Sequence, residues 1–144
     1  MRVSRRVLDA ITAHARRASP DECCGLLIGD EGRISDAVAT ENAAADPLRR
    51  YEISPSDYFS QIRRCRALAA HGTGPRVIGA YHSHPRGASS PSPTDRAQAF
   101  GAFLFMIAGL VSDGDAVDIR GYRLRDEILE EVQLVPDEAV GERP

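Results

Sequence analysis

The segment from Gly79 to Asp95 constrains this chain more than any other part; it reads GAYHSHPRGASSPSPTD. Its beginning continues an apolar and β-branched run that starts at Val77, which is typical of a strand. Residues two apart on a strand point to the same face, so His82 and His84 would project side by side. On a helix the same two side chains would diverge by about 200° and could not share an ion. The spacing therefore predicts a strand that ends in a pair of metal-capable histidines.

A carboxylate and a helix-start signal follow this strand. Two imidazole nitrogens and a carboxylate oxygen suit Zn²⁺, so Asp95 is the natural third ligand beside His82 and His84. Ser92 and Pro93 favour an N-cap and an N1 position, which would make Asp95 the N3 residue of a helix. Such a helix directs Asp95 back toward the histidines. We expect a metal-bound Asp95 carboxylate to be unavailable for closing the capping box.

The combined pattern resembles the JAMM (MPN-plus) zinc metalloproteases, whose signature is an upstream Glu, then His-Ser/Thr-His, seven residues and Ser-x-x-Asp. The stretch from His82 to Asp95 has this spacing. Glu22, in DECCGLLIG, resembles the upstream Glu that precedes a Gly-Leu-Leu-type strand. Without the downstream motif, Glu22 would be an ordinary loop carboxylate. The likeness covers roughly residues 7–132.

The resemblance implies a fold and a chemistry. The fold is α/β: a mixed, mostly antiparallel curved sheet flanked by helices, like that of the cytidine deaminases, with the zinc site at one sheet edge. One Zn²⁺ per chain would be held by His82, His84 and Asp95, with water in the open fourth position. Glu22 would be the general base that passes a proton to the leaving amine. Ser92 would donate a hydrogen bond to the oxyanion, and no organic cofactor is implied.

The same resemblance suggests substrates. JAMM enzymes cut the amide bond after the C-terminal Gly-Gly of ubiquitin or ubiquitin-like proteins. This short chain is most similar to small prokaryotic members that act on ubiquitin-like sulfur-carrier proteins, including one activity that releases cysteine in cysteine biosynthesis. A deubiquitinase-like isopeptidase acting on protein conjugates is one alternative. A non-catalytic MPN scaffold module is another, although such relatives generally lose motif residues.

Length and charge limit the other function classes. A chain of 144 residues predicts one domain, which we place at residues 1–134, with a mobile acidic tail at 135–144. The net charge of −3 indicates no broad surface for nucleic acid. We find no signal-peptide pattern and no apolar run of membrane-spanning length, so a cytoplasmic protein is expected. The sequence allows a homodimer but does not predict the oligomeric state.

The remaining sequence supplies the scaffold. Hydrophobic periodicity predicts helices at 4–18, 55–71 and 93–101, and strands at 23–29, 34–40, 51–54, 76–84, 103–111, 117–124 and 127–134, with a turn at 112–115. Tyr58 and Phe59 are expected in the core, and His14 on the surface. Three cysteines, two of them adjacent, give no disulfide framework, so buried thiols are expected. A Cys–His nucleophilic enzyme is the weaker alternative.

Overall fold

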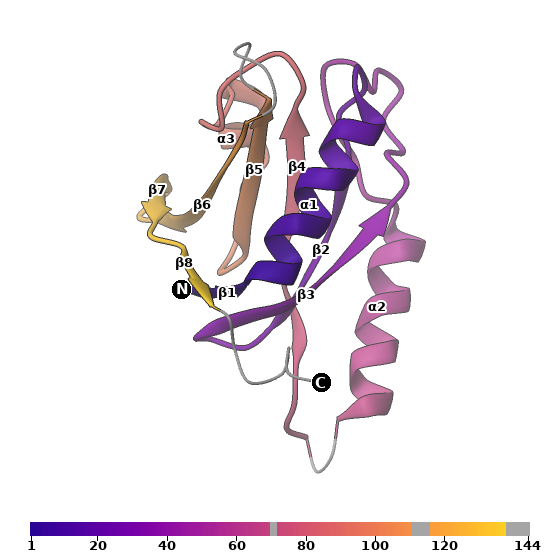
Figure 1. The fold of residues 1–144 in the computed structure, drawn as a ribbon. Helices are drawn as coiled ribbons and strands as arrows, with labels where there is room; N and C mark the ends of the chain where they lie inside the picture. Colours follow the sequence, from indigo (N-terminus) through magenta and orange to yellow (C-terminus); the bar gives the residue numbers. More distant parts are fainter. Residues whose placement is uncertain (70–71, 111–115, 138–144) are drawn as a thin grey trace.

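The computed structural model describes residues 1–69, 72–110 and 116–137. Within them, eight strands form one sheet in the order β7-β6-β5-β4-β2-β3-β1-β8, with three helices packed around it (Figure 1). The helices are α1 (Arg5–Ala18), α2 (Pro55–Leu68) and α3 (Pro93–Gln98). The strands are β1 (Arg2–Ser4), β2 (Cys24–Gly29), β3 (Arg33–Thr40), β4 (Arg76–His84), β5 (Leu104–Leu110), β6 (Val117–Arg125), β7 (Ile128–Val132) and β8 (Val135–Asp137).

The sheet is mixed, as the sequence predicted. Neighbours pair antiparallel at β2–β3, β2–β4, β5–β6 and β6–β7. The pairs β4–β5, β1–β3 and β1–β8 are parallel. The expected α/β class, with a curved and mostly antiparallel sheet, is therefore confirmed. The two apolar runs expected to be central, β2 and β5, do lie inside the sheet, on either side of β4.

Helix α1 lies across one face of the sheet (Figure 1). Its apolar residues recur at helical spacing, so Val7, Ile11 and Ala15 share one side and are fully buried. They join a core cluster that includes Tyr81 of β4 and Met106 of β5. Because successive strand residues point to opposite faces, His82 points away from this core. The fold thus reserves the face opposite α1 for the histidines.

Helix α2 differs from the sequence prediction in its packing. It contacts β4, but Cys65 is its one buried residue among the described positions. Phe59 and Leu68 are 54% and 72% exposed, so the prediction that Phe59 is a core residue is wrong. Tyr58 is half-buried and its ring lies 5.9 Å from that of Phe103. Only one narrow side of this helix faces the sheet, which leaves the other apolar residues in solvent.

Three strand predictions also require correction. The segment at 51–54 is irregular rather than a strand. The short strands β1 and β8 were not predicted, and β8 occupies the first three residues of the expected mobile tail. Strand β8 is held by parallel pairing with β1, and by two arginines, Arg2 and Arg33, at 2.7 and 3.0 Å from the Asp137 carboxylate. Residues 138–144 and the expected turn at 112–115 lie outside the described residues.

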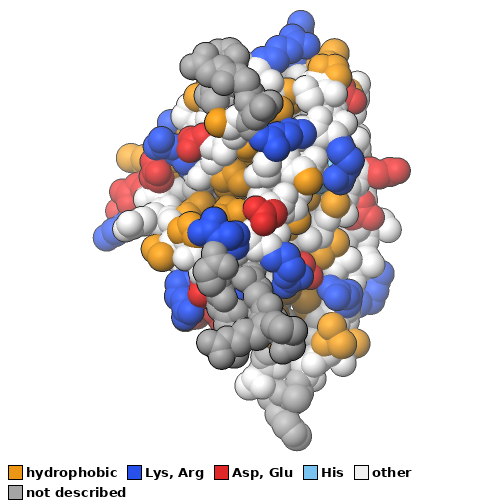
Figure 2. Space-filling view, in the orientation of Figure 1, with side chains coloured by type: hydrophobic (Ala, Val, Ile, Leu, Met, Phe, Trp, Pro, Cys, Tyr) orange, Lys and Arg blue, Asp and Glu red, His pale blue; other side chains and the backbone are white. Residues whose placement is uncertain are grey.

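The surface agrees with the modest net charge. On the face seen in Figure 2, arginine and acidic side chains are interspersed instead of forming one basic field. Along the described part of the chain, each helix is too short or too polar to cross a membrane. The cytoplasmic location expected from the sequence stays a prediction.

Candidate metal centre

Strand β4 carries both histidines at its C-terminal end. The strand lies between β2 and β5, and His82 pairs in register with Cys24 on one side and Ile107 on the other. His82 is therefore almost fully buried, with 2% of its surface exposed, while His84 is half-buried. The expected position at a sheet edge is not what is observed. The site lies at the end of a central strand, where neighbouring strands supply further groups.

Helix α3 carries Asp95, whose carboxylate contacts both histidines; Figure 1 shows this helix near the C-terminal end of β4. Ser92 is its N-cap: the Ser92 Oγ accepts a hydrogen bond from the Asp95 backbone N–H at 3.0 Å. Asp95 Oδ2 accepts from the Ser92 backbone N–H at 2.9 Å, which completes the capping box. Asp95 still reaches both rings, with Oδ1 3.1 Å from His82 Nε2 and Oδ2 3.1 Å from His84 Nε2.

In this arrangement the Asp95 carboxylate closes the capping box and faces both histidines at once, while the expectation for a metal-bound Asp95 stays a prediction. An ionised carboxylate has two oxygens with about four lone-pair sites, so one group can accept from a backbone N–H and also face two ligand nitrogens. The capping box consequently fixes the orientation of Asp95 toward the histidines instead of competing for it.

The spacing of the ligand atoms of these three residues fits a small cation. The two histidine Nε2 atoms lie 3.2 Å apart, similar to their 3.1 Å distances from the carboxylate oxygens. Ligands bound tetrahedrally to zinc at about 2.0–2.1 Å lie about 3.3 Å from one another. His82, His84 and Asp95 also form a group whose ligand atoms all lie within 4.8 Å. The residues present therefore fit the zinc that the motif implies.

Hydrogen bonding of the His84 ring supports the same conclusion. Its Nδ1 lies 2.8 Å from the Ala88 carbonyl oxygen. A carbonyl can only accept, so Nδ1 carries a proton, and the ring in its neutral form presents a lone pair at Nε2. That lone pair faces the Asp95 carboxylate and the Nε2 atom of His82. A proton can satisfy only one of these contacts, whereas a metal ion can bind all three atoms.

Burial and pairing shift the pKa values of the three residues in different directions. Burial lowers the pKa of His82 and outweighs its hydrogen bond with Asp95. Burial also acts to lower the pKa of His84, but the hydrogen bonds with Asp95 and the Ala88 carbonyl raise it overall. Burial acts to raise the pKa of Asp95, yet its bonds with both histidines hold that pKa far below its usual range. Asp95 therefore stays ionised, as a metal ligand must.

Tyr51 is a site residue that sequence reasoning missed. Its ring stacks on that of His82, with centroids 4.2 Å apart and an interplanar angle of 17°. The stack holds the His82 ring in place. Among the described residues, the buried Nδ1 atom of His82 has no hydrogen-bond partner. The sequence around Tyr51 gives no sign of this role. Its pattern predicts only a strand at 51–54.

Glu22 reaches the site through the register of β2. Cys24 pairs with His82 across antiparallel strands, so Glu22, two residues earlier, comes beside His84. The Glu22 backbone N–H donates to the Pro47 carbonyl at 2.8 Å, which fixes the entry into β2. Glu22 and His84, with Ser92, line one cavity of about 360 Å³.

The Glu22 side chain has the properties of a proton acceptor. It is only 8% exposed. Burial, the largest effect, raises its pKa to about 7; His84 lowers it and Asp95 raises it further. A carboxylate whose pKa lies near neutrality can exchange protons at physiological pH, which is the requirement for a general base.

Comparison with known proteins identifies the family. The family model described as "Prokaryotic homologs of the JAB domain" matches residues 4–125. This chain belongs to that family. The motif-based resemblance to JAMM proteins is thereby confirmed, and the chain is a JAB domain.

Curated relatives agree with this assignment. A CysO-cysteine peptidase of Mycobacterium tuberculosis is 34% identical over 122 residues, covering 83% of this chain and 80% of that protein. A desampylase of Haloferax volcanii is 36% identical over 97 residues, or 63% of this chain and 66% of the relative. Tail tip assembly protein K of Escherichia phage N15 is 34% identical over 93 residues, or 65% of this chain. This chain spans only 34% of that phage protein's length.

Solved structures share the fold of this JAB domain. A Desulfitobacterium hafniense protein, 22% identical, superposes with a TM-score of 0.83 over 99% of this chain and 97% of its own. A JAB1/MPN domain protein from Archaeoglobus fulgidus, 24% identical, has a TM-score of 0.58 over 93% and 96% of the two chains. A structure described as a JAMM metalloprotease-like zinc site, 23% identical, has a TM-score of 0.54 over 94% and 97%.

The loop after β4 is anchored to the sheet of this JAB domain. Ser89 is buried; its Oγ donates to the Asp118 carboxylate, and its carbonyl accepts from the Tyr122 hydroxyl at 2.8 Å. The loop backbone lies directly over Gly109 of β5, where a Cβ atom would come within 2.6 Å of the Ser89 nitrogen. The loop therefore holds the Ala88 carbonyl in place against His84.

We predict that Gly109→Ala weakens metal binding. The added methyl group would meet backbone atoms that cannot move separately, so the loop must shift and the His84–Ala88 hydrogen bond must lengthen. Loss of an orienting partner of a ligand histidine typically lowers metal affinity by about 10–100-fold. Competition with a chromogenic chelator measures this affinity. Gly32→Ala is the control, since its Cβ would meet only Asp30 Oδ1 at 3.8 Å. Unchanged affinity in Gly109→Ala would contradict the role of the loop.

The cysteines and His14 take no part in this site. Cys23, Cys24 and Cys65 are buried free thiols, as expected. Burial raises the pKa of Cys24 to about 11, so it is not a thiolate at neutral pH, which disfavours a Cys–His nucleophile. The prediction that His14 is a surface residue is wrong: it is half-buried, and its Nδ1 lies 2.7 Å from the Tyr81 hydroxyl.

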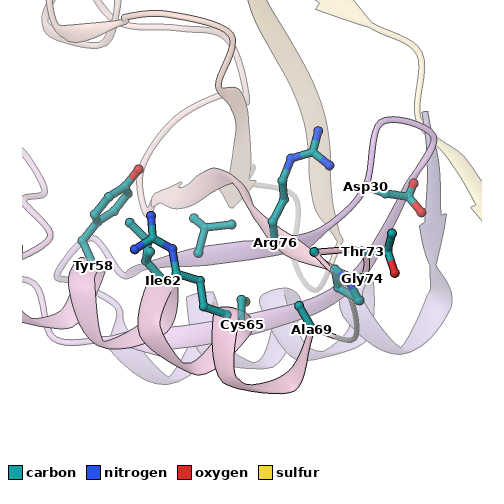
Figure 3. A pocket seen from close by; sticks show the side chains of 12 residues that line it. Asp30, Tyr58, Ile62, Cys65, Ala69, Thr73, Gly74 and Arg76 are labelled. Atoms are coloured by element: carbon teal, nitrogen blue, oxygen red, sulfur yellow. The ribbon is translucent and has the colours of Figure 1, made fainter.

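A larger cavity lies away from the metal-capable residues. It measures about 700 Å³ and lies between α2 and the beginning of β4 (Figure 3). Tyr58, Ile62 and Cys65 of α2 point into it, with Arg76 at the start of β4. None of its lining residues belongs to the predicted site, because the histidines lie at the opposite end of the same strand.

Proposed function

We propose that this JAB domain is a zinc-dependent peptidase that hydrolyses the amide bond after the C-terminal Gly-Gly of a ubiquitin-like sulfur-carrier protein. The observation that carries the proposal is the convergence of three ligand atoms beside a carboxylate with a pKa near 7. The relative named CysO-cysteine peptidase supports the carrier as substrate and cysteine as the released residue. This would place the domain in cysteine biosynthesis.

The chain's own residues supply the proton transfers. A zinc ion held by His82, His84 and Asp95 would lower the pKa of water and polarise the substrate carbonyl. Glu22 accepts the proton of the attacking water and then delivers it to the leaving amine as the carbon–nitrogen bond breaks. Ser92 lines the same cavity. Its hydroxyl proton is free to bond the developing oxyanion, because its oxygen acts as the acceptor in the helix cap.

A second candidate within the same chemistry is an isopeptidase that acts on protein conjugates. The relative named desampylase favours it. A non-catalytic scaffold is the third candidate, and the complete set of Glu22, His82, His84, Ser92 and Asp95 argues against it. The two enzymes differ in the group released, a single amino acid or a lysine-linked protein, so matched substrates separate them.

The first test concerns the metal. We expect about one zinc per chain by elemental analysis, and we expect chelators to remove the zinc together with activity. His82→Ala and Asp95→Ala should each weaken zinc binding by more than about 100-fold, beyond the effect of residues that only orient a ligand. His14→Gln is the control histidine. Full zinc occupancy in both ligand variants would refute the assignment.

The second test concerns the reaction. The zinc-loaded protein should release cysteine from a purified carrier–Cys fusion, followed by mass spectrometry. Zinc binding without cleavage of either the carrier–Cys fusion or a lysine-linked conjugate would favour a binding module.

A further inference from the structure

The rim of the catalytic cavity carries two arginines that the proposed mechanism does not use. Arg49 follows the segment that holds Glu22 in place, and Arg86 belongs to the loop after β4. Both line the cavity of about 360 Å³ that also contains Glu22, His84 and Ser92. Glu22 is the one carboxylate among the lining residues. Two guanidinium groups and one carboxylate therefore line this cavity.

Among the described residues, neither of these two guanidinium groups is held in a close, buried ion pair. Among the described residues, Arg86 is exposed and has no ion pair. Arg49 lies 3.9 Å from the Asp46 carboxylate, with side chains 85% and 46% exposed. Pairs this open to solvent are worth little. By contrast, Arg33 and Arg120 each donate to carboxylates at 2.9–3.0 Å.

The cavity is small, with an apolar wall. About 360 Å³ is near the lower limit of about 300–1,000 Å³ for sites that bind small molecules. Leu48, which is 46% exposed, lines the cavity together with Pro85 and Pro91. Such a space can accept one amino acid.

We propose that Arg49 and Arg86 bind the free α-carboxylate of the residue released from the carrier. The inference rests on the proposed function and specifies its substrate class: a carrier that bears one additional C-terminal amino acid. The planar guanidinium matches a carboxylate with two parallel hydrogen bonds. The α-carboxylate carbon lies about 2.5 Å from the scissile nitrogen, so it must enter this same cavity. A lysine-linked conjugate has an uncharged aliphatic stem at that position.

The test compares three substrates made from the same carrier: carrier–Cys with a free carboxylate, carrier–Cys carboxamide, and the carrier joined to a lysine side chain. For the wild-type zinc-loaded protein, kcat/KM should be about 10–100-fold higher for the free acid than for the carboxamide, as expected for hydrogen bonds to a charged group. Arg49→Gln and Arg86→Gln should each lower kcat/KM for the free acid, mainly by raising KM. The double variant should bring the acid-to-amide ratio close to one.

Arg50→Gln is the matched control, because Arg50 is adjacent in sequence but does not line the cavity. The same two Cys substrates titrated into Glu22→Gln protein by calorimetry give an independent readout, in which the free acid should bind more tightly. Equal kcat/KM for acid and amide in the wild type, or an unchanged ratio in the double variant, would overturn this inference alone. Failure to cleave any of the three substrates would overturn the proposed function and this inference with it.

Discussion

Glu22→Gln is expected to lower kcat on a carrier–Cys fusion by about 10²–10⁴-fold while zinc remains bound. Gln has nearly the same shape as Glu but cannot accept the proton of the attacking water. Because the Glu22 carboxylate is not one of the three grouped ligand atoms, zinc content should stay near one per chain. Elemental analysis and turnover, measured on the same sample, test both expectations. A metal-free Glu22→Gln protein would make Glu22 a ligand, and near-normal turnover would remove it from the mechanism.

The pH dependence follows from the raised pKa of Glu22. A general base must be ionised, so kcat/KM should fall as the pH drops through the pKa of Glu22. That pKa is about 7 without metal, and a cation bound in the same cavity lowers it. The fall of kcat/KM on the acidic side of the rate–pH profile should therefore lie at or below pH 7. It should disappear in the residual activity of Glu22→Gln, which a rate–pH profile from pH 5 to 9 would show.

The free energy of unfolding, measured for the Glu22→Gln variant, shows whether that variant is folded. Burial raises the pKa of Glu22 from 4.5 to about 7, so the folded state favours the protonated form. The metal-free wild type is thus destabilised above pH 7, where Glu22 must be ionised, and not below pH 4.5, where it is protonated in both states. Glu22→Gln should raise the free energy of unfolding of chelated protein at pH 8 by about 1–2 kcal/mol, after allowance for solvent screening. This advantage should shrink toward pH 5.

Local periodicity was sufficient to predict the core of the site. The strand period of two places His82 and His84 on one face, and β4 has the predicted bounds of 76–84. The helix-start signal at Ser92 correctly predicted that Asp95 points toward the histidines. Each of these predictions depends on interactions within a few residues. The role of the Asp95 carboxylate in both the cap and the ligand group was not anticipated, because sequence does not show how two oxygens are shared.

Features that depend on distant pairing could not be derived from the residues. Glu22 lies beside His84 only because β2 pairs with β4 in one register, and it was found by resemblance to the family motif. The stacking of Tyr51 on His82 joins an irregular segment to a central strand and has no local signal. Strands β1 and β8 are each three residues long, and their pairing links the two ends of the described chain. The Ala88 contact with His84 comes from a backbone carbonyl, which leaves no trace in the side-chain pattern.

Ser92 is the residue for which two roles must be separated. The structure shows that it is an N-cap, with its Oγ accepting from Asp95 at 3.0 Å. Loss of such a cap costs about 0.5–2 kcal/mol of stability. Loss of an oxyanion donor costs about 10²–10³-fold in kcat. Ser92→Ala removes both functions, so it should lower the melting temperature and also kcat.

The fold offers a control in Ser54, whose side chain caps α2 with the same kind of hydrogen bond. Its Oγ accepts from the Asp57 backbone N–H at 3.1 Å, with Pro55 at the first helical position. Ser54 does not line the cavity of Glu22 and Ser92. Ser54→Ala should therefore lose similar stability but keep kcat. The difference in kcat between the two alanine variants isolates the chemical role of Ser92.

Ser92→Asn completes the argument, because Asn is a good N-cap without a hydroxyl group. We expect Ser92→Asn to keep most of the melting temperature and the bound zinc, and to lose most of kcat. The Asn amide can itself donate a hydrogen bond, so its kcat is interpreted together with that of Ser92→Ala, which can neither cap nor donate. If kcat in both Ser92 variants falls no further than in Ser54→Ala, then Ser92 acts only through the helix that carries Asp95, and the oxyanion must be stabilised by other groups.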